Sequence, residues 1–75
     1  MEEYETMSDS EKASSIRSKI KNIQYQKYSL ELDLVAENAI EEPDAAIISS
    51  IQLQMSNLDA KQAALSNELS LLNVV

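Results

Sequence analysis

A single proline and a complete absence of glycine are the features that most constrain how this chain folds. Pro43 lies near the middle of the 75 residues, and neither side of it contains another residue that punctuates a helix. The two flanking stretches are rich in Leu, Ile, Ala, Ser, Gln and Glu, a composition typical of helical bundles. The chain is therefore predicted to be all-α, with one long helix on each side of Pro43.

Local signals place the ends of these helices. Ser8-Asp9-Ser10-Glu11 has the spacing of a capping box, in which Ser8 and Glu11 satisfy each other's backbone N–H groups. Pro43 suits the first position of a second helix, because its missing N–H would have no partner there. We expect an acidic tail over 1–7 and a hairpin domain over 8–75, with helices over 8–41 and 44–73 and a bend at 42–43.

Apolar residues recur at intervals of three and four on both sides of the proline, which is the spacing of a heptad seam. Ala13 opens the series, and Lys27 and Gln62 each fill one gap in it. The remaining seam residues are Ile16, Ile20, Ile23, Leu30, Leu34, Ile48, Ile51, Met55, Leu58, Leu65, Leu69 and Leu72.

The two series can face each other in antiparallel order, because opposing residues have numbers that add to 85. Leu34 then meets Ile51. Lys27 falls beside Asp59, which can receive its ammonium group. The pattern predicts a coiled-coil-like helical hairpin.

One long kinked helix is the rival arrangement, since the heptad continues in phase through Glu37, Glu41 and Asp44. A parallel coiled coil would bury these carboxylates without partners, which is costly. A hairpin instead exposes them at an acidic bend made of Glu37, Glu41, Glu42 and Asp44. The hairpin is therefore the favoured interpretation.

A second set of apolar and small residues remains after the hairpin forms. Between Ala45 and Val75 the only charged residues are Asp59, Lys61 and Glu68, fewer than a fully solvated helix normally carries. The predicted partner interface consists of Tyr25, Tyr28, Leu32, Val35, Ala39, Leu53, Ala60, Ala64 and Leu71. We expect this surface to be covered in an oligomeric bundle or a larger complex.

The composition argues against catalysis and cofactor binding. The chain has no histidine, no cysteine and no glycine-rich phosphate loop, and a two-helix hairpin has no enclosed pocket. We therefore expect no enzymatic activity, no catalytic residues, no cofactor, no metal ligands and no small-molecule substrate.

Charge and hydropathy limit the remaining partners. Nucleic acid is disfavoured, because the basic stretch from Lys12 to Lys27 is flanked by acids and the net charge is −7. No apolar run is long enough to span a membrane, and the acidic start does not resemble a secretion signal. We expect a protein partner, in the cytoplasm or in a particle assembled inside the cell.

Three functional hypotheses follow. The leading one is a non-enzymatic structural or assembly protein that associates with itself or with a larger complex. The second is a small acidic regulatory binder, either an inhibitor or an adaptor, of a basic protein. The third is an RNA-binding dimer of hairpins.

Overall fold

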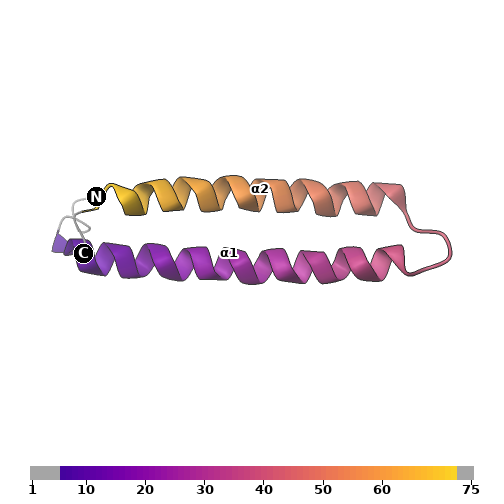
Figure 1. Ribbon diagram of the computed structural model, residues 1–75, viewed down its shortest axis with the longest axis horizontal. Coiled ribbons are helices and arrows are strands. Elements are labelled where there is room, and N and C mark those ends of the chain that lie inside the picture. The colour runs from indigo at the N-terminus through magenta and orange to yellow at the C-terminus, as the bar shows by residue number, and fades with distance from the viewer. Residues whose placement is uncertain (1–5, 73–75) are drawn as a thin grey trace.

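The structure is a computed structural model that describes residues 6–72. It contains two helices, α1 (Asp9–Asn38) and α2 (Ala45–Ser70), and no strand within those residues. The helices run antiparallel and side by side, with the bend at one end and the start of α1 beside the end of α2 at the other (Figure 1). The molecule is a rod of 55 × 20 × 19 Å. The all-α hairpin is thus confirmed, and the single kinked helix is excluded.

Helix α1 begins at the predicted capping box. The Ser8 hydroxyl accepts a hydrogen bond from the Glu11 N–H at 3.1 Å, and the Glu11 carboxylate accepts one from the Ser8 N–H at 2.9 Å. Hydrogen bonding to the Ser8 backbone, and secondly to its side chain, holds the pKa of Glu11 below its usual value. The exchange satisfies two backbone donors that a helix start leaves without partners.

Helix α1 ends at Asn38, not at residue 41 as predicted, so the connection covers residues 39–44 and not only 42–43. The Ala39 N–H bonds to the Ala36 carbonyl at 3.2 Å, which tightens the last turn. The residue before a proline also avoids helical geometry, which disfavours a helix that continues to Glu42. These two effects shorten the helix.

Helix α2 begins at Ala45 with Asp44 as its N-cap. The Asp44 carboxylate accepts hydrogen bonds from the backbone N–H groups of Ala46 at 2.8 Å and Ile47 at 3.4 Å. Pro43 therefore precedes the cap, and its predicted place as the first helical residue is wrong. The acidic cap is the physical reason, since its side chain satisfies the donors of the first turn.

Helix α2 ends at Ser70, before the predicted residue 73. Leu71 and Leu72 form a tightened turn in which their N–H groups bond to the carbonyls of Glu68 and Leu69 at 3.1 and 3.2 Å. Residue 73 and residues 1–5 of the predicted acidic tail lie outside the described residues. Met7, at the end of that tail, is half-buried.

The core is a thin strip between the two helices. Its buried residues are Ala13, Ile23, Ile51 and Leu58. The other residues at seam spacing are half-buried: Ile16, Ile20, Lys27, Leu30, Leu34, Glu37, Ile48, Met55, Gln62, Leu65, Leu69 and Leu72. A hairpin of two helices covers only one face of each.

Candidate association surface

Two polar residues interrupt the apolar strip between α1 and α2, and their interactions differ. Lys27 reaches across to form a salt bridge with Asp59, the pairing that the sequence predicts. The Oε1 atom of Gln62 is buried and has no hydrogen-bond partner within the described part of the chain. The contact between the helices is thus mostly apolar, with one ion pair and one unsatisfied acceptor.

The outward face of α1 carries a row of large apolar side chains. Tyr25, Tyr28, Leu32 and Val35 are 63%, 60%, 51% and 66% exposed, and Ala39, which continues the row, is also exposed. Their spacing of three and four places them on one side of the helix, roughly opposite the seam. We call these five residues the outer stripe. All five belong to the partner interface predicted from the sequence.

The outward face of α2 is less apolar. Leu53 and Leu71 are 63% and 70% exposed, and the small residues Ala60 and Ala64 on the same face are also exposed. The two leucines lie far apart along the helix, so only small and polar side chains fill the space between them. The outer stripe on α1 is therefore the more continuous apolar surface.

At the bend the four predicted acids have separate roles. The Glu37 carboxylate accepts a hydrogen bond from the Asp44 backbone N–H at 2.9 Å, and Asp44 itself caps α2. Glu41 and Glu42 are exposed. Two of the four carboxylates thus close the connection, and the other two face solvent. Within residues 6–72 no group of acids lies together in a way that suits a metal ion.

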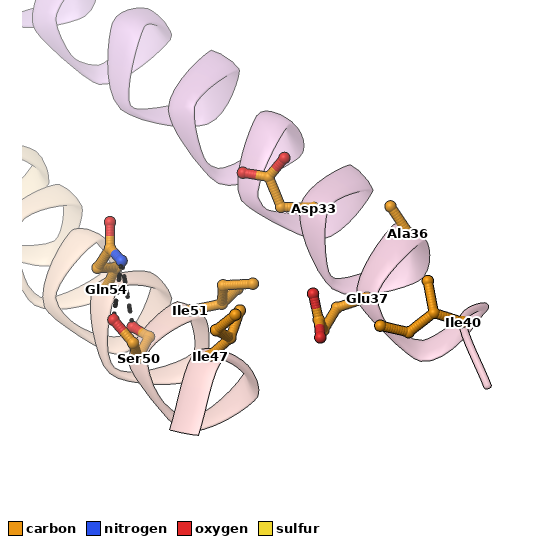
Figure 2. A pocket seen from close by; sticks show the side chains of 8 residues that line it. All are labelled: Asp33, Ala36, Glu37, Ile40, Ile47, Ser50, Ile51 and Gln54. Atoms are coloured by element: carbon orange, nitrogen blue, oxygen red, sulfur yellow. Dashed lines mark hydrogen bonds between the residues drawn. The ribbon is translucent and has the colours of Figure 1, made fainter. Parts of the chain in front are cut away.

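Beside the bend lies an open hollow that the sequence analysis missed (Figure 2). Ile47 and Ile51 from α2 point across it towards Glu37 and Ile40 of α1 (Figure 2). Ile40 and Ile47 remain 51% and 46% exposed. The sequence signal for this hollow is the pair Ile47-Ile48. Two adjacent isoleucines cannot both lie in one seam, so one of them must lie outside it. The hollow is completed by Asp33, Ala36, Ser50 and Gln54.

Neither described helix contains a segment that is both apolar and long enough to cross a bilayer. The sequence matches no known protein family, and comparison with curated proteins and with solved structures also gives no match. The surfaces of this chain are therefore the features from which a function is inferred.

Proposed function

We propose that this hairpin is a non-enzymatic association module, which acts by packing the outer stripe of α1 against another polypeptide. The observation that carries this proposal is the continuous row of exposed Tyr25, Tyr28, Leu32 and Val35 on the face turned away from α2. Contiguous exposed apolar surface on a small protein is typical of protein–protein interfaces. Tyrosine is also among the residues enriched there.

The thin core supports the same conclusion. Four residues of the described chain are buried, and no disulfide is available because the sequence has no cysteine. Chains of this size seldom gain more than a few kcal/mol from their own core. Covering the outer stripe would add about 1.5–3 kcal/mol for each large apolar side chain that becomes fully buried. Association therefore contributes substantially to the stability of the folded chain.

The proposal is tested by placing a charge in the outer stripe. Leu32→Glu puts a carboxylate at the centre of the proposed interface, where burial without a partner is costly. We expect this variant to lose association with the partner while its helical content, followed by circular dichroism, stays close to that of the unmodified chain. The readout is mass from light scattering during size exclusion, over a range of protein concentrations.

Gln26→Glu is the matched control. It adds the same charge to the same helix at an exposed position off the outer stripe. We expect it to associate like the unmodified chain. Equal association by Leu32→Glu and Gln26→Glu would remove the outer stripe from the interface and contradict the proposal. Leu53→Glu extends the test to α2, and its effect measures how far the interface includes that helix.

A second candidate function, a binder of basic proteins, is favoured by the hollow at the bend. Its apolar floor, formed by Ile40, Ile47 and Ile51, lies next to the carboxylates of Asp33 and Glu37. This combination fits a partner segment that presents an apolar side chain next to lysine or arginine. Binding of such a peptide should weaken as salt concentration rises and should be lost in Ile47→Glu. Binding that is unchanged by both would contradict this candidate.

A further inference from the structure

We infer that the outer stripe of α1 packs against the outer stripe of a second copy of this chain, with the two α1 helices antiparallel. The inference rests on the proposed function and names its partner and orientation. It is carried by the distribution of charge along α1 together with the position of the apolar row.

Charge is segregated along α1 and its connection to α2. Arg17 and Lys21 lie in the first half of α1, on the side of the helix that carries the outer stripe, and both are exposed. The second half and the bend carry the exposed acids Glu31, Glu41 and Glu42. The molecule is therefore basic along one part of its outer surface and acidic along the next.

Within one hairpin, these charges are not all paired with opposite charges. A salt bridge joins Lys27 to Asp59 at the contact between the helices. Helix α2 adds only two other charged residues, Lys61 and Glu68. Arg17 and Lys21 have no ion-pair partner within the described part of their own chain. Neighbouring acids from another molecule would complement them.

A second copy supplies those acids if it runs in the opposite direction. Parallel pairing would set the basic half of α1 against the same basic half and one acidic bend against the other. Antiparallel pairing sets the basic segment of each α1 against the acidic bend of its partner. Like charges across an interface are unfavourable and opposite charges are favourable, so the charge pattern selects the antiparallel orientation. A two-fold axis relates two identical surfaces in this way.

The register follows from the apolar row. Residue numbers that add to 60 place Tyr25 opposite Val35 and Tyr28 opposite Leu32, with the two-fold axis at the level of residue 30. A shift of one heptad in one direction places Tyr25 opposite Glu42, and a shift in the other places Leu32 opposite Lys21. The central register alone pairs all four large apolar residues with each other. It also brings residues 17–21, with Arg17 and Lys21, level with residues 39–43 of the second copy, which include Glu41 and Glu42.

The orientation is tested by spin-label distances. Because the chain has no cysteine, Ser18→Cys and Ser29→Cys each create one labelling site, and both positions are exposed. With a rise of 1.5 Å per residue, antiparallel pairing separates two Ser18 labels by about 36 Å along the axis and two Ser29 labels by about 3 Å. Parallel pairing in register gives short distances at both positions. Double electron–electron resonance on each labelled chain measures them.

A long distance at position 18 with a short distance at position 29 supports the inference. Short distances at both positions overturn the antiparallel orientation but leave the association function standing. No inter-label distance at either site, with a monomeric mass from light scattering, overturns the inference. If the chain then also associates with no other protein through Leu32, the proposed function fails as well.

Charge reversal gives an independent test that does not depend on labels. Replacing Arg17→Glu and Lys21→Glu together should weaken the dimer about tenfold at low salt, because acid would then face acid. Adding Glu41→Lys and Glu42→Lys to the same chain restores opposite charges across the antiparallel interface, and we expect dimerisation to recover. Further weakening in the fourfold variant would contradict the antiparallel pairing.

Discussion

The two faces of α1 have the same spacing of apolar residues and different surroundings. On the inner face, Ala13 and Ile23 are buried against α2. On the outer face, intervals of three and four recur in residues that are each more than half exposed, namely Tyr25, Tyr28, Leu32 and Val35. The comparison shows that the same spacing of apolar residues occurs both on a face that α2 covers and on a face that it leaves exposed. The bend decides which face α2 covers.

The largest difference between the two faces should appear on truncation to alanine. Ile23→Ala removes a side chain that is 7% exposed, and we expect it to lower the free energy of unfolding by about 2–4 kcal/mol. Val35→Ala, on the outer face of the same helix, should change it by about 0.5 kcal/mol or less in the dilute chain. Urea denaturation followed by circular dichroism measures both values. Equal losses would contradict the assignment of inner and outer faces.

Replacing Gln62 should make the inner face more stabilising. Its Oε1 atom is buried without a hydrogen-bond partner in the described chain, and such a group carries a desolvation cost. Gln62→Leu should therefore raise the free energy of unfolding by about 1–2 kcal/mol in the same denaturation experiment. Gln54→Leu is the control, because Gln54 is exposed and bonds to the Ser50 carbonyl at 3.3 Å. A destabilised Gln62→Leu would mean that the amide has a partner after all.

The bend determines which face of α1 packs against α2, and it depends on a helix cap. Asp44→Ala removes the acceptor for the Ala46 and Ile47 N–H groups and should lower the free energy of unfolding by about 1 kcal/mol. Asp44→Asn keeps an acceptor oxygen and should recover most of that loss. Thermal unfolding of the two variants makes the comparison, and equal melting temperatures for them would exclude capping as the role of Asp44.

The smallest expected effect concerns the other end of α1, where the pKa of Glu11 is lowered by hydrogen bonding to Ser8. A carboxyl whose pKa is lower in the folded state stabilises the fold above its unfolded-state pKa, near 4.3. That contribution is lost as the pH falls through the folded-state pKa. The melting temperature should therefore fall slightly less between pH 6 and pH 3 in Glu11→Gln than in the unmodified chain. An identical pH dependence would contradict this linkage.

Much of the fold is predictable from the sequence because it depends on local spacing. Intervals of three and four identify the residues that α2 covers, and Ser8 with Glu11 marks the start of α1. The end of α1 is not predictable in the same way, because it depends on the path of the connection, in which the Glu37 carboxylate accepts a hydrogen bond from the Asp44 N–H seven residues away. The exposure of Ile40 and Ile47 depends on the same path. Local spacing in the sequence also does not identify what would cover the outer stripe.

The most direct test of the central claim is sedimentation equilibrium of the unmodified chain at several concentrations, with helicity recorded in parallel. Self-association through the outer stripe predicts a helical species whose mass corresponds to two chains and which dissociates on dilution. A fully helical monomer at every concentration, with the outer stripe left in solvent, would contradict self-association through α1.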